Sequence, residues 1–240
     1  MSLQLKIFES LPATTYLDLL RDGDLKVTCS QLGEDTILIH LLVTHVQKVH
    51  NGFYVDVGAY HPRELSNTRL LHFLGWRGVN IDANPKAIAA FEAERPNDIN
   101  VCTGIGTEEQ DLTYYHFAGG AASTFSPEMA EHLRSSPSFQ QVGQETLHVR
   151  PLNDVLTESV PPGTVIDYMD IDIEGLDRKV VEHLDFDRFG PSVLSIELHE
   201  ADLMRLGEDP TVRYIVGKGY KLMAVNIVTF TFMRQSLFKP

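Results

Sequence analysis

Short, strongly apolar segments recur along the chain, and two of them carry an aspartate near the carboxyl end. The first is Gly52–Gly58 (GFYVDVG), which contains Asp56, and the second is Val79–Asp82 (VNID). Their apolar residues do not alternate with polar ones, which is typical of parallel strands buried on both faces. Segments with helical signals separate the strands. This alternation predicts an α/β fold, a mainly parallel sheet with right-handed crossovers and helices on both faces.

The remaining elements follow from the same signals. Further strands are expected at Ile99–Cys102, Leu112–Phe117, Val165–Ile171, Ser192–Leu198, Tyr220–Val225 and Ile227–Met233. The last two are joined at Asn226 and suit an antiparallel hairpin, whereas Leu112–Phe117 suits an edge hairpin. Helices are expected at Asn67–Leu74, Asn84–Glu94, Leu176–Leu184 and Pro210–Lys218. The prediction is a seven-stranded, mainly parallel sheet that ends in an antiparallel C-terminal hairpin.

The chain divides into an N-terminal part and an α/β domain. Residues 1–49 are expected to form a helical extension, because residues 15–48 read as helical and Ser30-Gln31 precedes Glu34-Asp35 as a capping signal. Residues 50–240 form the domain. Within it, residues 118–150 have a glycine-rich entry and a Ser/Pro-rich exit that flank a short helix-like segment, and their apolar content is low. This composition favours a mobile loop or lid, and a plain surface excursion is the alternative.

Composition limits the partners. The 240 residues carry a formal charge of −13 and their 20 basic residues are scattered, so we expect no nucleic-acid partner. Cys29 and Cys102 lack any zinc spacing and are expected to be free thiols in a reducing cytoplasm, with Cys102 as a small core residue. Charges and Pro12 interrupt the first 20 residues too often for a signal peptide or a membrane span. A homo-oligomer stays open.

Ligands of open parallel sheets bind outside the carboxyl ends of the strands, where Asp56 and Asp82 fall. The two acids are 26 residues apart, about one β-α-β unit, and Asp82 can accept hydrogen bonds from both hydroxyls of a ribose. The turn after Asp56 has one glycine, Gly58, and lacks the GxGxxG series that a dinucleotide pyrophosphate needs. A nucleoside cofactor with an amino-acid tail fits better. Asp56 would hold the ammonium group of that tail, and helix-start amides near Asn67 and Thr68 would meet its carboxylate.

A third strand end, Cys102–Gly106, would lie where an adenine ring rests. Gly104 lets a flat base come close, and Ile105 would pack on its face. A GxG turn is common by itself, so this segment supports the cofactor site only together with the two acids.

The fourth strand end, Asp167–Gly175 (DYMDIDIEG), is the most acidic part of the chain. On a strand, Asp170, Asp172 and Glu174 point the same way, and three like charges on one face require a cation or hydrogen-bond donors. Such a cluster suits a divalent metal or the deprotonation of a hydroxyl. The alternative is that Glu174-Gly175 merely starts the next helix.

The fifth strand ends in Glu197-Leu-His199, which should lie beside the acidic cluster. His199 is the best-placed histidine for a general base, and His61 is second. We therefore predict Asp172, Glu197 and His199 as the catalytic residues. The same three residues would be the ligands if Mg²⁺ or Mn²⁺ activated the acceptor, although no complete coordination shell is evident and we favour a base without a metal. His116 and His132 are expected to be surface or packing residues.

Taken together, several segments resemble the FkbM family of methyltransferases. They are Ser30–Asp35 (SQLGED), Val55–Gly58 (VDVG), Ser66–Thr68 (SNT), Gly75–Pro85 (GWRGVNIDANP) and Asp170–Gly175 (DIDIEG). The resemblance covers about residues 30–200 and excludes residues 1–29 and 118–150. It implies a Rossmann-like class I methyltransferase fold and methyl transfer from S-adenosyl-L-methionine to a hydroxyl of a sugar, glycan or polyketide-type acceptor.

Position and resemblance together give the candidate cofactor-contacting residues: Gln31, Asp56, Gly58, Tyr60, Asn67, Thr68, Asp82, Ala83, Gly104, Ile105 and Asp170. In such a reaction the cofactor supplies the leaving group, and the protein holds the acceptor oxygen about 3 Å from the methyl group and removes its proton. One alternative is a nucleotide-dependent oxidoreductase or epimerase, which the single-glycine turn and the lack of a Tyr-x-x-x-Lys pair disfavour. The other is a catalytically silent partner module, which the acids at every expected strand end disfavour.

Overall fold

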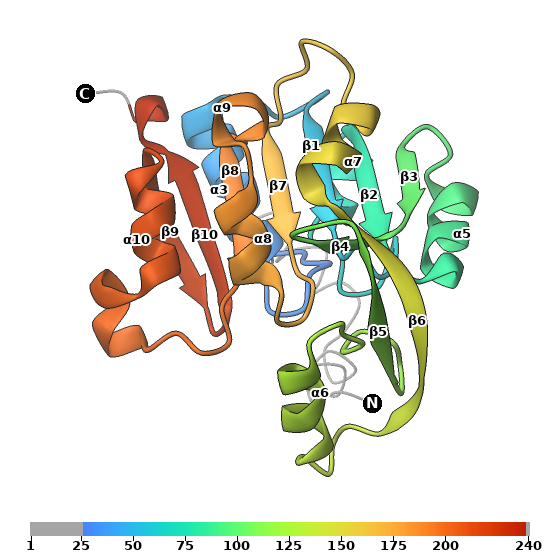
Figure 1. The fold of residues 1–240 in the computed structure, drawn as a ribbon. Helices are drawn as coiled ribbons and strands as arrows, with labels where there is room; N and C mark the ends of the chain where they lie inside the picture. Colours follow the sequence, from blue (N-terminus) through green and yellow to red (C-terminus); the bar gives the residue numbers. More distant parts are fainter. Residues whose placement is uncertain (1–25, 239–240) are drawn as a thin grey trace, which may run out of the picture.

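A sheet of seven strands organises the computed structural model, which describes residues 26–238. The order across the sheet is β3-β2-β1-β7-β8-β10-β9 (Figure 1). The strands are β1 Phe53–Val57, β2 Arg77–Asp82, β3 Ile99–Cys102, β7 Tyr168–Ile171, β8 Val193–Glu197, β9 Tyr220–Asn226 and β10 Thr229–Arg234. The first five run parallel, and β10 is antiparallel to both β8 and β9. The predicted fold class is confirmed, including the antiparallel hairpin at the C-terminus.

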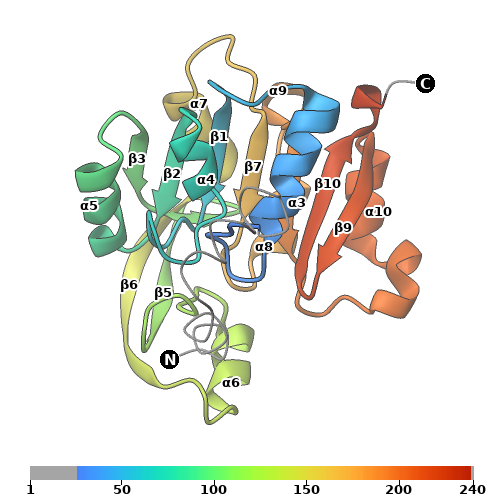
Figure 2. The same cartoon turned by 180° about the vertical axis from the view of Figure 1, so that it is seen from behind.

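Helices cover both faces of this sheet, as Figures 1 and 2 show from opposite sides. One face carries α3 Glu34–Leu41, the π-helical turn η1 Leu42–Val46, α4 Arg69–Phe73 and α5 Pro85–Glu94; the other carries α7 Leu152–Ser159, α8 Asp177–His183, α9 Phe186–Phe189 and α10 Pro210–Gly217. In β1, Val55 and Val57 pack in the core with α7 and α8, whereas Tyr54 packs with α3 and α4. Two apolar layers explain why the strand lacks polar alternation. Two 3-10 turns, η2 Leu203–Glu208 and η3 Gln235–Leu237, complete the described chain.

A second, three-stranded sheet projects past the carboxyl ends of β1 and β7 (Figure 1). It consists of β4 Gly104–Gly106, β5 Gln110–Phe117 and β6 Gln141–Pro151, in the order β4-β6-β5, and α6 Pro127–Arg134 lies beside it. Residues 118–150 therefore contain α6, in the place of the expected helix-like segment, and most of an eleven-residue strand that was not expected. Most residues of β6 are exposed, so the strand lacks the apolar pattern that reveals a buried one. The expected edge hairpin at Leu112–Phe117 is the β5–β6 pair of this second sheet.

The N-terminal helix is shorter than expected. Within the described residues it runs from Glu34 to Val46, counting η1, while residues 15–25 of the prediction lie outside them. The capping signal is in the right place but acts differently: the N-cap is Gly33, and the Ser30 hydroxyl accepts hydrogen bonds from the amides of Gly33 and Asp35. Among the described helices none has the length and apolar character needed to cross a bilayer.

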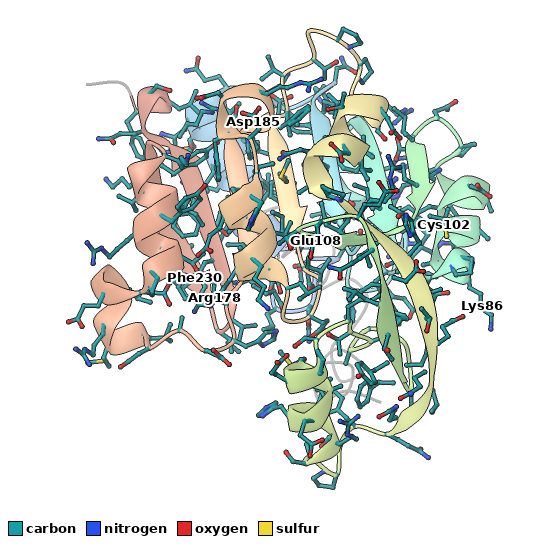
Figure 3. The ribbon with its side chains drawn as sticks, in the orientation of Figure 1. Lys86, Cys102, Glu108, Arg178, Asp185 and Phe230 are labelled. Atoms are coloured by element: carbon teal, nitrogen blue, oxygen red, sulfur yellow. The ribbon has the colours of Figure 1, made fainter. Side chains whose placement is uncertain are left out.

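The expectation that Cys102 is a core residue was wrong. Both cysteines are free thiols, as predicted, but Cys102 is exposed and not a core residue. It ends β3, which is an edge strand of the main sheet (Figure 3). A strand at the edge buries less of its surface than a central one, and the sequence does not reveal which strand takes that place.

Candidate active site

The carboxyl ends of β1, β2 and β7 meet at one rim of the main sheet. At Gly58 the chain that leaves β1 comes close to the chain that leaves β7. The φ of Gly58 is +85°, in the left-handed region, and a Cβ placed on this glycine would lie 1.7 Å from the carbonyl oxygen of Asp172. Only glycine accommodates both conditions. The turn after β1 therefore packs closely against the chain that leaves β7.

A cavity opens beside this turn. Asp82, Ala83, Gly104 and Ile105 line it, together with Gly58 and Tyr60. The two carboxylate oxygens of Asp82 accept hydrogen bonds from backbone amides, from Tyr60 at 2.9 Å and from Asn84 at 2.7 Å. Burial raises the pKa of Asp82, and these two amides oppose the rise. Each oxygen keeps a further lone pair, so the carboxylate can still accept from two hydroxyls.

A second cavity shares Gly58, Tyr60, Asp172 and Glu174 with the first. Its walls include Gln31, Asp56, Asn67 and Asp170. Asn67 Nδ2 donates to Asp170 Oδ2 at 2.7 Å. The two cavities thus adjoin along the rim and together form an elongated space.

Two buried carboxyl groups, of Asp56 and Asp170, lie side by side in this second cavity on paired strands. Burial raises the pKa of Asp56 to about 6, and a hydrogen bond from Thr68 opposes the rise. Burial, and then the charge of Asp56, raise the pKa of Asp170 well above its ordinary value. Two acids in this setting favour a cationic ligand, because a cation lowers the cost of ionising both.

Nearly all the predicted cofactor-contacting residues line one of the two cavities, and Thr68 is the exception. Thr68 is fully buried, and its hydroxyl contacts Asp56 and Arg95. It therefore lies behind the cavity wall. The prediction concerned the backbone amide of Thr68 and not its side chain.

The predicted catalytic residues are divided by the structure. Ligand atoms of Glu174, Glu197 and His199 lie within 4.8 Å of one another, and Asp172 is not a member of this group. His199 Nε2 is 2.9 Å from Glu197 Oε2 and 3.7 Å from Glu174 Oε2. The regular alternation assumed for Asp170, Asp172 and Glu174 stops because β7 ends at Ile171 and Glu174 has a φ of +52°. Glu174 thereby occupies the place predicted for Asp172.

The residues of this group change one another's pKa values. The hydrogen bond to Glu197 is the main cause that raises the pKa of His199. Burial and then Glu197 raise the pKa of Glu174 to about 8, while His199 opposes the rise. Burial and then Glu197 also raise the pKa of Asp172 well above its ordinary value. A base and neighbouring acids with displaced pKa values are an arrangement that suits proton transfer.

Sequence reasoning missed the aromatic wall of the first cavity. Tyr114 of β5 and Phe125, just before α6, have ring centroids 4.6 Å apart and both line that cavity. The segment between them also closes on the site, because Tyr60 Oη donates to the Gly119 carbonyl at 2.9 Å and Thr124 Oγ1 donates to the Glu174 carbonyl at 2.6 Å. The glycines at 119–120 indicated an irregular segment, but no local pattern predicts that this segment packs against the site.

The other histidines lie outside this arrangement. His61 lines neither cavity, and its Nδ1 accepts from the amides of Arg63 and Glu64 within a turn. His116 pairs with Glu145 on the second sheet, and His132 is exposed on α6. His199 and Glu197 also line neither cavity, but His199 lies beside the site, because its Nε2 is 3.7 Å from Oε2 of Glu174, which lines both cavities. Its role as the general base stays a prediction.

Comparison with known proteins identifies the family. The model of the methyltransferase FkbM domain matches residues 56–237. A solved structure described as methyltransferase FkbM from Methylobacillus flagellatus KT is 16% identical with a TM-score of 0.47, covering 76% of this chain and 43% of that one. An O-methyltransferase from Bacillus cereus in complex with SAH is 13% identical with a TM-score of 0.40, covering 93% of this chain and 91% of that one. This chain thus spans less than half of the first of these two chains. No curated protein matches it in sequence. The family model covers most of the chain, which therefore belongs to the FkbM family of methyltransferases.

Proposed function

We propose that the protein transfers a methyl group from S-adenosyl-L-methionine to a hydroxyl oxygen of a sugar, glycan or polyketide-type acceptor. The observation that carries the proposal is the continuous rim site, with Asp82 at one end and Asp56 at the other. Asp82 would bind the ribose hydroxyls, with the adenine ring against Gly104 and Ile105. Asp56 and Asp170 would bind the ammonium group of the amino-acid tail, the cation that their raised pKa values favour.

The residues present fit this cofactor at both ends. Asp82 offers free lone pairs to two hydroxyls, and the acidic pair Asp56–Asp170 offers a site for a cation. The bound cofactor supplies an activated methyl group with a good leaving group. The remaining task of the protein is to hold the acceptor oxygen in line and to take up its proton.

His199 is the residue that we propose for proton removal. In its neutral form it accepts the hydroxyl proton on a ring nitrogen, and Glu197, 2.9 Å from Nε2, stabilises the imidazolium that results. We propose this base without a metal. Glu174, Glu197 and His199 could each offer one ligand atom to a metal ion, and chelation with EDTA separates the two mechanisms.

Calorimetry on the wild type and on Asp82→Ala tests the cofactor assignment. The wild type should bind S-adenosylmethionine and not NAD, and Asp82→Ala should weaken binding by about 1–3 kcal/mol, since it removes a charged partner of buried hydroxyls. Asp187→Ala, an exposed acid on α9, serves as the matched control and should bind normally. Unchanged affinity in a folded Asp82→Ala protein would contradict the ribose assignment.

Turnover on a panel of glycan and polyketide hydroxyl acceptors, read by mass spectrometry, tests the reaction itself. One product should gain the mass of a methylene group, and EDTA should leave the rate unchanged. Activity that is lost with EDTA and restored by Mg²⁺ or Mn²⁺ would replace the metal-free base by a metal site. Tight cofactor binding without turnover on any acceptor would favour the catalytically silent partner module.

A further inference from the structure

A buried arginine lies behind the second cavity. Arg95 follows α5 and is 2% exposed. Its guanidinium donates to the Pro62 carbonyl at 2.5 Å and to Ser66 Oγ at 3.2 Å, both in the segment that connects β1 to α4. The same segment contains Asn67, which lines the cavity and contacts Asp170. One side chain from α5 therefore holds this wall of the cavity from outside.

Arg95 also reaches the carboxylate of Asp56 through one intermediate. Arg95 Nη1 lies 2.9 Å from Thr68 Oγ1, and Thr68 Oγ1 lies 2.7 Å from Asp56 Oδ2. A guanidinium has no acceptor, so Thr68 accepts from Arg95, and its own proton is left to donate to Asp56 when that carboxyl group is ionised. The direction of both hydrogen bonds is then fixed, and so is the orientation of the Asp56 carboxylate.

The surroundings of Asp56 are otherwise mostly acidic. Asp170 is its partner on β7, Asp82 and Asp98 act on it from β2 and from the turn before β3, and the Tyr168 hydroxyl is close on β7. Burial is the largest cause that raises the pKa of Asp56, and Asp82 and Asp98 add to it. The Thr68 hydrogen bond and the charge of Arg95 lower it. Around Arg95 itself lie the Tyr54 hydroxyl, which donates to Asp98, and the ring of Phe91.

We propose that Arg95 is a positioning residue for the amino-acid end of the cofactor, acting through Thr68 on Asp56 and through Pro62 and Ser66 on the wall that bears Asn67. The inference rests on the proposed function, since it assigns a role at the same site. It adds a residue that touches neither cavity and lies nearly 40 positions after Asp56 in the sequence.

Calorimetric titration of S-adenosylmethionine and of S-adenosylhomocysteine between pH 6 and pH 8.5 tests this role. At pH 6.5, Arg95→Gln should raise the Kd of both ligands about tenfold or more, because Asp56 loses the cation that keeps it ionised. At pH 8.5 the difference from the wild type should shrink, since Asp56 ionises there without help. The wild type and Arg95→Gln bind the same ligand, so any change in the protonation of the ligand affects both Kd values equally and cancels in their ratio. In turnover, the KM for the cofactor should rise and the KM for the acceptor should not.

Two further variants keep the test decisive. Thr68→Val, nearly isosteric, breaks the link to Asp56 but leaves the Arg95 contacts to Pro62 and Ser66, and it should show the same pH dependence. Arg234→Gln is the matched control, because that arginine also donates to backbone carbonyls, those of Gly190 and Pro191, outside both cavities. It should lower stability without changing the pH profile of Kd.

The outcomes separate the two proposals. A wild type that does not bind S-adenosylmethionine overturns the proposed function. A wild type that binds, with folded Arg95→Gln and Thr68→Val proteins whose Kd equals the wild-type value at every pH, overturns only the role of Arg95. A loss of affinity in Arg95→Gln that is equal at all pH values, with no loss in Thr68→Val, overturns the action through Asp56, because the Thr68 link would then carry none of the effect.

Discussion

At the scale of single residues, His199 is partly exposed and pairs with a carboxylate, that of Glu197. The sequence alone led us to expect an ordinary imidazole with a pKa near ~6.5. The structure adds a carboxylate, because Glu197 lies 2.9 Å from Nε2 and raises the pKa of His199. The consequence is that the neutral, proton-accepting form of His199 is populated at higher pH than in a solvated histidine.

This environment gives a prediction for the pH dependence of turnover. With the cofactor saturating, kcat/KM should rise with pH through an apparent pKa above that of ordinary histidine. Glu197→Gln should move the midpoint to lower pH, since the imidazolium loses the anion that stabilises it, even where the maximal rate falls. His132→Gln, exposed on α6, is the control and should leave the midpoint in place. Full turnover in His199→Ala, or an unmoved midpoint in Glu197→Gln, would contradict the assignment.

At the scale of elements, the sequence was informative where strands are buried and uninformative where they are exposed. Residues of β1 and β7 are almost all buried, and their apolar composition identified both strands. β6 is long but mostly exposed, so nothing in its composition distinguished it from a loop. The acidic segment after β7 was located correctly, but its geometry depends on the positive φ of Glu174, which local patterns do not predict. Tyr114 and Phe125 joined the site through contacts between separate elements.

The segment 118–124 between β5 and α6 is the element for which we predict closure over the site. Its contacts to the site include the Tyr60–Gly119 and Thr124–Glu174 hydrogen bonds, and Ala118, Gly119 and Ala121 are exposed. Proteinase K should cut there early, and more slowly once cofactor and acceptor are bound. Tyr60→Phe removes one of the two contacts and should speed the cleavage. The exposed turn at 161–163 is an internal control whose cleavage should not respond to ligands. Equal cleavage of residues 118–124 with and without ligands would argue for a passive loop.

At the scale of the whole molecule, periodicity and strand-end acids predicted the sheet and the cofactor candidates, but not the contacts that join distant segments. Lys48 Nζ lies 2.7 Å from Asp167 Oδ2, and Arg95 donates to Thr68. In both cases the two residues are far apart in sequence, and no sequence pattern predicts the contact. Such pairs depend on how helices dock on the sheet. The parallel sheet follows from the alternation of strands and helices, so it was predictable, whereas the order of the strands and the side-chain partners between layers depend on packing and were not.

The concentration of buried acids at one rim has a consequence for the stability of the entire chain. Burial raises the pKa of Asp56 and of Asp177 to about 6 and that of Glu174 to about 8. In the unfolded chain these groups ionise near their ordinary values of ~4. Between the unfolded and the folded pKa values the native state holds more protons, so the free energy of unfolding falls as pH rises through that interval. His199 acts in the same direction, because the stability that its raised pKa provides is lost as pH rises through the folded value.

We therefore expect the ligand-free protein to lose about 1–3 kcal/mol of its free energy of unfolding between pH 6 and pH 8, measured by urea unfolding at fixed ionic strength. Glu174→Gln should flatten this slope, because an amide has no proton to lose and no charge to bury. Glu92→Gln, an exposed glutamate of α5, should leave the slope unchanged. S-adenosylmethionine should flatten it as well, since its ammonium group would stabilise the ionised forms of Asp56 and Asp170. A free energy of unfolding that does not fall from pH 6 to pH 8 would mean that the rim acids are already ionised in the folded protein, and the cationic end of the cofactor would then need another explanation.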